Sequence, residues 1–222
     1  ESGVKQGAEL VVDGRDFKLQ GYEEGFFVGP HLFDRVTSDM AEAVDGVQVI
    51  MVVIPAMAHG DLARNLVAHL QPGQLVILNP GRTFGALEVG QIFKAAGVAR
   101  DVTIAEAQSL IFACRVLEPG TVKILKFKNS VPLACMPAWR IPELINLLHE
   151  ALPQFIPGDD ILKTGLSNVG CILHPIATIM NSAWIEDNRG DFDFYHQGIS
   201  RSVAMVIEAV DAERLAVAAA LG

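Results

Sequence analysis

The feature that most constrains the fold is a nearly continuous apolar, β-branched run at residues 47–54, which ends at Pro55. A strand with one face in water alternates apolar and polar residues, whereas a strand covered on both faces is apolar throughout. The run is as long as a strand and falls far short of the roughly 18 residues that a membrane span requires. It therefore predicts a buried strand of a parallel sheet.

The segments that follow alternate between helical and strand patterns. Residues 61–70 and 84–96 carry apolar side chains at helical spacing, while residues 75–78 and 102–105 are short apolar runs. Strand, helix, strand, helix, strand implies right-handed crossovers and a parallel sheet covered by helices. The sequence thus predicts the second half of a Rossmann-like, doubly wound α/β domain.

Two further β-structures are expected outside this repeat. Residues 17–22 and 25–28 have the pattern of a short hairpin. Residues 121–127 and 131–135 are predicted to form a second antiparallel pair, since Asn and Ser residues lie between them. The lysines of this region, Lys123, Lys126 and Lys128, are typical of a protected sheet edge, and a substrate-binding role is the alternative.

The character of the chain changes at Pro157. Residues 1–157 are predicted to form the Rossmann-like domain and residues 158–222 the start of an all-helical domain. Helical patterns occur at residues 175–186 and 200–221. The last of these is apolar to its end, so we expect its partner to be either another chain or a further C-terminal segment.

Composition excludes several classes of partner. The sequence has 17 basic and 26 acidic residues, a net charge of −9, which disfavours nucleic acid and anionic membranes. Its three cysteines, Cys114, Cys135 and Cys171, are widely spaced without a C-x-x-C motif. This pattern predicts neither a metal site nor a disulfide framework, and it favours a reducing cytoplasm.

Polar residues gather where the predicted strands end, at residues 55–59, 79–83 and 106–109. Ligands of open parallel sheets bind at the carboxyl ends of the strands. Gly81 permits close approach of a flat ligand, and Arg82 could bind a carboxylate or phosphate. A plain turn is the alternative interpretation of this second segment.

Two histidines are candidates for proton transfer. His174 follows Asn168 in the segment of residues 168–175 and precedes Pro175, which could open a helix and place the ring at its N-terminus. A packed or exposed histidine without function is the alternative. His59 is better explained as the first residue of a helix.

Taken together, these residues resemble the octopine/nopaline (opine) dehydrogenase family from about residue 35 onward. The matching stretches are residues 49–55, 58–59, 79–88, 106–115, 174–175, 194–200 and 211–214.

The resemblance implies a reductive condensation dependent on NAD or NADP, which joins the amine of an amino acid to an α-keto acid such as pyruvate. It makes His174 the catalytic histidine and Gln108, Ser109 and Asn168 substrate-binding residues. The residues it places beside the nicotinamide end of the cofactor are Pro55, Ala56, Asn79, Pro80, Gly81 and Arg82.

The sequence departs from the family pattern because it contains no G-x-G-x-x-G turn. We therefore expect an internal portion of a longer enzyme, incomplete at both ends. One alternative is a related reductase of the ketopantoate reductase or glycerol-3-phosphate dehydrogenase type, which relies on a lysine, here Lys163. Another is a non-catalytic binding protein with a decayed dehydrogenase fold.

Overall fold

A computed structural model of the chain describes residues 9–12, 32–34, 37, 39–98, 101–118 and 121–222. The chain separates into two compact units, residues 1–45 and 46–222. In the first unit, β1 (Glu9–Val12) pairs antiparallel with β2 (Leu32–Asp34). The hairpin predicted at residues 17–22 and 25–28 lies outside the described residues.

The first unit also contains the short helix α2 (Met40–Val44). Asp39 precedes it with extended backbone, and its carboxylate accepts hydrogen bonds from the backbone N–H groups of Ala41 and Glu42. A side-chain acceptor at this position satisfies donors that the first helical turn leaves unpaired.

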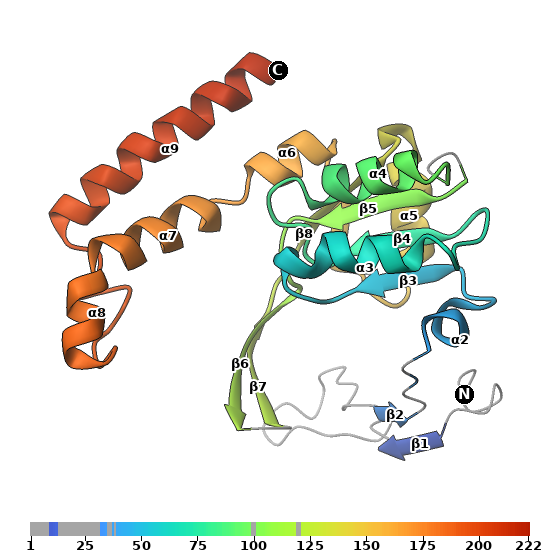
Figure 1. Cartoon of the computed structure of the whole chain (residues 1–222), viewed down its shortest axis with the longest axis horizontal. Coiled ribbons are helices and arrows are strands. Elements are labelled where there is room, and N and C mark those ends of the chain that lie inside the picture. The colour runs from blue at the N-terminus through green and yellow to red at the C-terminus, as the bar shows by residue number, and fades with distance from the viewer. Residues whose placement is uncertain (1–8, 13–31, 35–36, 38, 99–100, 119–120) are drawn as a thin grey trace. The chain divides into compact units, whose positions relative to one another are not determined.

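The second unit is built around a five-stranded sheet in the order β3-β4-β5-β8-β9 (Figure 1). Its strands are β3 (Val49–Val52), β4 (Leu75–Leu78), β5 (Thr103–Ala107), β8 (Val131–Met136) and β9 (Phe155–Pro157). The first three are parallel, as predicted, but β8 runs antiparallel to β5 and parallel to β9. The sheet is therefore mixed rather than wholly parallel.

Three helices cover this sheet: α3 (His59–Leu66), α4 (Gly85–Ala95) and α5 (Ile141–Leu148). The helices α3 and α4 contact each other, and α5 packs on β8 and β9 (Figure 1). Ile77, Phe93 and Leu133 are fully buried between the layers. Each side chain of this kind contributes about 1.5–3 kcal/mol when it leaves water, which explains why the apolar runs form the core.

The second predicted antiparallel pair is wrong. The strand β7 (Thr121–Phe127) pairs with β6 (Phe112–Glu118), and together they leave the sheet as a separate ribbon (Figure 1). The strand β8 instead joins the main sheet, because most of its side chains are apolar and buried there. The lysines of β7 are exposed, which suits a ribbon in water.

Helices follow β9: α6 (Ile161–Leu166), α7 (Gly170–Met180), α8 (Ser182–Asn188) and α9 (Arg201–Leu221). Caps fix two of them, since Asp160 accepts from the N–H of Lys163 and Ser200 from that of Val203. The start predicted at Pro175 is wrong, because α7 begins one turn earlier and contains this proline. None of the helices in the described part of the chain is long and apolar enough to cross a membrane.

Candidate functional site at the carboxyl ends of the strands

The turn after β4 carries four of the predicted cofactor-binding residues, Asn79 to Arg82. The N–H of Asn79 donates to the carbonyl of Val52, the last residue of β3, at 2.8 Å, so the ends of the two strands lie side by side. Asn79 is 7% exposed, and its side-chain Oδ1 is buried with no hydrogen-bond partner among the described residues. A buried acceptor without a donor is costly unless something binds it.

Backbone conformation sets the direction of the turn. Arg82 and Phe84 have φ angles of 61° and 60°, in the left-handed region that residues with a Cβ rarely adopt. Non-glycine residues in this region are often found at functional sites, where the surrounding structure holds them. Arg82 is exposed and Phe84 half-buried, so the turn presents the guanidinium side chain to solvent.

The turn after β4 is joined to the segment that ends β5. The N–H of Gly81 donates to the carbonyl of Ala107 at 3.0 Å, and the N–H of Gln108 donates to Pro132 at 2.9 Å. Gly81 and Arg82 therefore lie beside the loop that carries Gln108 and Ser109. The structure brings these predicted residues together at one edge of the sheet.

Glu106, which the sequence reasoning did not single out, anchors this edge. Its buried carboxylate accepts hydrogen bonds from the N–H of Ala86 at 2.9 Å and from the hydroxyl of Thr164 at 2.6 Å. It thus joins β5 to the first turn of α4 and to α6. Burial raises the pKa of Glu106, and the two hydrogen bonds oppose the shift. An acidic residue within an apolar strand was the available signal.

Ser109 has a cation as its partner. The Nζ atom of Lys128 donates to Ser109 Oγ at 2.7 Å, and the backbone N–H of Lys128 donates to Ile111 at 2.8 Å. Lys128 was predicted as part of a lysine-rich strand edge, with a substrate-binding role as the alternative. It lies instead beside the loop of predicted substrate-binding residues.

Asn168 connects the helical segment with the turn after β4. Its Nδ2 atom donates to Thr83 Oγ1 at 3.0 Å. A Cβ atom added to Gly170 would stand 3.2 Å from Asn168 Oδ1 and 3.3 Å from His174 Nδ1. The side chains of Asn168 and His174 therefore both lie beside Gly170, at the start of α7.

His174 is exposed and has two hydrogen-bond partners. Its Nδ1 lies 3.0 Å from the carbonyl of Gly170, and its Nε2 lies 3.1 Å from the hydroxyl of Tyr195. Because a carbonyl can only accept, Nδ1 carries a hydrogen, and Nε2 of the neutral ring accepts from Tyr195. Nε2 is thus the atom that can take up and release a proton.

The expected position of this ring at a helix N-terminus is wrong, because His174 lies in the second turn of α7. Its described hydrogen bonds and ring contacts all fall within residues 170–195, with Phe194 and Tyr195 as ring neighbours. The segment that bears His174 is connected to the strand ends by the hydrogen bond from Asn168 to Thr83.

The remaining candidates lie nearby or have other roles. Pro55 and Ala56 follow β3, and neither is buried. His59 begins α3, as predicted for a helix-start residue, and burial lowers its pKa against the opposing charge of Glu88. Lys163 is exposed and forms an ion pair with Asp159, four residues before it.

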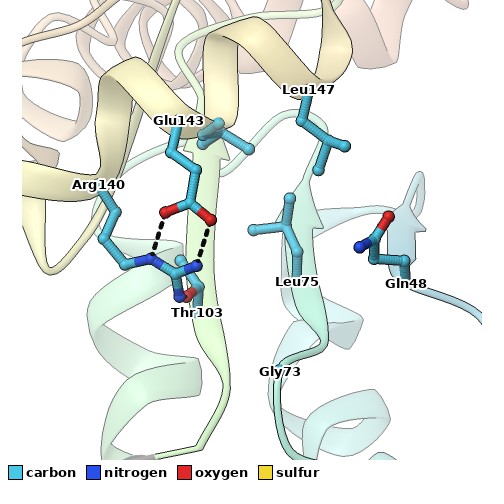
Figure 2. Close-up of a pocket in the computed structure, with 8 residues that line it drawn as sticks. Gln48, Gly73, Leu75, Thr103, Arg140, Glu143 and Leu147 are labelled. Atoms are coloured by element: carbon cyan, nitrogen blue, oxygen red, sulfur yellow. Dashed lines mark hydrogen bonds and ion pairs between the residues drawn. The ribbon is translucent and has the colours of Figure 1, made fainter.

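A cavity at the opposite edge of the sheet is too small for a dinucleotide. It has a volume of about 50 Å³ and lies where β4 and β5 begin, at Leu75 and Thr103 (Figure 2). A water molecule occupies roughly 30 Å³ of liquid. Arg140 lines the cavity and donates hydrogen bonds to the side chains of Glu143 and Thr103. No cluster of metal-binding side chains occurs among the described residues.

Comparisons with known proteins point to one family. Residues 157–222 match the protein family "NAD/NADP octopine/nopaline dehydrogenase, alpha-helical domain". An opine dehydrogenase from Arthrobacter sp. (strain 1C) is 40% identical over 187 residues, which cover 84% of this chain and 52% of that enzyme. The chain spans about half the length of the curated opine and tauropine dehydrogenases that it matches.

A second, short likeness points to another kind of enzyme. A malonate-semialdehyde dehydrogenase from Pseudomonas aeruginosa is 65% identical over 40 residues, which are 18% of this chain and 8% of that protein. So small a share of an enzyme carries no argument about its activity.

The fold is shared with solved structures. A structure of octopine dehydrogenase in complex with NADH and agmatine matches with a TM-score of 0.59 at 21% identity, covering 79% of this chain and 45% of that chain. The family match, the 40% identical relative and the shared fold agree, so this chain is similar to the octopine/nopaline (opine) dehydrogenase family, and residues 157–222 match the helical domain of that family.

Proposed function

We propose that this chain carries out, as part of an opine dehydrogenase, an NAD(P)H-dependent reductive condensation of an amino acid with an α-keto acid such as pyruvate. The observation that carries the proposal is the link between Asn168 and Thr83. It connects the segment that bears His174 to the strand ends that bear Gly81 and Gln108. The similarity to opine dehydrogenases supports the same reaction, which forms a C=N bond and reduces it to a C–N single bond.

The residues at the end of β4 fit a nicotinamide cofactor. The unpartnered Oδ1 atom of Asn79 is an acceptor that the carboxamide N–H of a nicotinamide could use. Pro80, Gly81, Arg82, Pro55 and Ala56 complete the proposed cofactor-binding residues. When bound, NADH or NADPH supplies the hydride for the reaction.

The chain's own residues would supply proton transfer and orientation. His174 Nε2 would take a proton from the ammonium group of the amino acid and pass it to the keto oxygen, which leaves as water when the amine and the carbonyl form an imine. Gln108, Ser109 and Asn168 bind the two substrates through amide and hydroxyl groups. Hydride delivery to the imine carbon then gives a secondary amine with two carboxylates.

The choice of test substrates follows the relatives. Solved octopine dehydrogenase complexes contain NADH with agmatine, L-arginine or pyruvate, and a yersinopine dehydrogenase structure contains NADP⁺. We therefore propose an amino acid or amine together with pyruvate as substrates of this chain, with either dinucleotide as cofactor.

We also propose a boundary between a Rossmann-like domain, residues 1–157, and a helical domain, residues 158–222. The end of β9 at Pro157 and the start of the family match at residue 157 support it. The three free cysteines favour a cytoplasmic location.

A homodimer is the assembly we propose, with α9 at its interface. Apolar side chains along this helix are exposed in the single chain, which favours burial against a second copy. They are Met205, Val206, Leu215, Val217 and Leu221.

The experiment measures keto-acid-dependent oxidation of NADH and NADPH with pyruvate and a panel of amino acids. The histidine variant His174→Ala should lose about 10²–10⁴-fold in kcat, the usual contribution of a positioned acid–base group. His149→Ala is the matched control, since His149 follows α5 outside the site. Turnover of His174→Ala at the unmodified rate would contradict the role of this ring, and turnover with ketopantoate alone would favour the related reductases.

A further inference from the structure

Lys128 is held in place by the backbone and by one side chain. Its N–H donates to Ile111, and its ammonium donates to the hydroxyl of Ser109 at 2.7 Å. An ammonium has three hydrogens to donate, and Ser109 takes one of them. No carboxylate forms an ion pair with Lys128 among the described residues.

Arg82 brings a second positive charge to the same place. It extends from the turn whose Gly81 N–H bonds Ala107, two residues before Ser109. Burial and, secondarily, the charge of Arg82 lower the pKa of Lys128, so the two cations lie close enough to repel each other. Arg82 likewise has no ion pair with a carboxylate in the described part of the chain.

Two neighbouring cations without a counter-charge are unusual on a chain whose net charge is −9. Their repulsion is relieved when an anion binds between them, and charge-assisted hydrogen bonds are the stronger class. Because Ser109 Oγ accepts from Lys128, its own O–H hydrogen remains available for the same anion. Toward a bound anion, the three groups therefore offer only hydrogen-bond donors.

We propose that Lys128, Arg82 and the Ser109 hydroxyl form a binding site for the carboxylate of the α-keto acid substrate. The inference rests on the proposed function and adds to it the residues that recognise this carboxylate. A cofactor phosphate is the other anion with suitable chemistry. The carboxylate is favoured because the site continues through Thr83, next to Arg82, to Asn168 of the helical segment. The α-keto acid must reach His174, which belongs to the same helical segment as Asn168.

The test is calorimetric titration of the chain with pyruvate, with inorganic phosphate and with NADH, each measured separately and pyruvate also in the presence of NADH. Lys128→Met removes the ammonium and keeps a flexible apolar chain. Arg82→Gly removes the guanidinium and suits the positive φ angle of this position. Lys123→Met is the control, because this exposed lysine of β7 bears the same charge away from Ser109.

We expect Lys128→Met and Arg82→Gly each to weaken pyruvate binding by about tenfold to a hundredfold, the usual effect of losing a charged hydrogen bond. NADH binding should stay unchanged in Lys128→Met, and Lys123→Met should bind all three ligands as the unmodified chain does. Should Lys128→Met fail to fold, Arg82→Gly still decides the question.

Two results would overturn the proposal. One is loss of phosphate and NADH binding with pyruvate binding intact, which would assign the cations to a cofactor phosphate. The other is equal pyruvate affinity in all variants, or none in the unmodified chain. Pyruvate binding that depends on Lys128, together with no amino-acid-dependent NADH oxidation, would leave this site standing and contradict the proposed function instead.

Discussion

Gly81 packs directly against the side chain of Glu106. A Cβ atom added to Gly81 would overlap Glu106 Cβ and stand 2.6 Å from its Oε2. The same carboxylate bonds Ala86 at the start of α4 and Thr164 of α6. One glycine therefore allows a buried acid to hold the turn after β4, a helix start and the helical segment together.

Replacing Gly81 with alanine should disrupt this packing. The neighbour that a methyl group meets is the Cβ of Glu106, which is attached to the backbone of β5 and cannot rotate away. We expect Gly81→Ala to lower the free energy of unfolding by about 1–3 kcal/mol, the usual cost of overpacking. Denaturation in urea, followed by circular dichroism, measures this loss.

The control for this prediction is Gly60→Ala in α3. The methyl group there meets the carboxylate of Glu88, the far end of a flexible and exposed side chain. Alanine also favours the helix, so Gly60→Ala should be neutral or stabilising. Equal losses in both variants would show that the contact with Glu106 is unimportant.

The ionisation of Glu106 should make stability depend on pH. Burial raises its pKa above the ordinary glutamate value of 4.5, so the folded chain holds the proton more tightly than the unfolded chain. The free energy of unfolding should therefore fall as the pH rises from about 4.5 through the raised pKa. Glu106→Gln should remove this fall, because the amide accepts from Ala86 and can donate to the hydroxyl of Thr164.

Melting temperatures between about pH 4 and pH 8 measure the effect. Glu186→Gln is the control, since this exposed carboxylate of α8 has no such burial and should leave the pH profile unchanged. A Glu106→Gln profile parallel to that of the unmodified chain would place the pH dependence elsewhere.

Periodicity predicted the elements whose burial dictates their sequence. The strands β3, β4 and β5 and the helices between them are apolar where the core requires it, as at Ile77 and Phe93. The strand β6 was missed and β7 was given the wrong partner, because pairing depends on contacts between distant residues. Local patterns such as Asn129-Ser130 show a break in the chain without showing which strands meet.

The candidate site was likewise predictable where the signal is local and unpredictable where it depends on distant residues. The sequence indicated polar residues at strand ends, and hydrogen bonds join Gly81 to Ala107 and Asn168 to Thr83. It could not indicate the partner of Ser109, because Lys128 arrives from the end of a ribbon 19 residues later. It also misplaced the start of α7, since Pro175 is compatible with a first turn and with a helix that bends or loses one bond around it.

Lys163 should be dispensable for catalysis. The related reductases considered from sequence depend on a lysine at the start of the helical domain, but here its ammonium is exposed and paired with Asp159. We expect Lys163→Met to keep kcat and KM within about twofold, because a surface ion pair contributes little. Steady-state kinetics with pyruvate and an amino acid test this. A loss of kcat by orders of magnitude would support the chemistry of the ketopantoate type.

The hydroxyl of Tyr195 should position the imidazole of His174. It donates to Nε2 at 3.1 Å, while the tyrosine ring packs edge-on against both His174 and Phe194. Tyr195→Phe removes only the hydrogen bond, and we expect kcat to fall by about fivefold to tenfold, as for loss of one neutral hydrogen bond. Tyr195→Ala also removes the ring contacts and should cost more. If the two variants lose the same activity, packing contributes nothing to the orientation of the ring. If Tyr195→Phe retains full kcat while its pH profile is unchanged, the hydroxyl has no part in holding the proton-transferring nitrogen, and Gly170 alone fixes the ring through Nδ1.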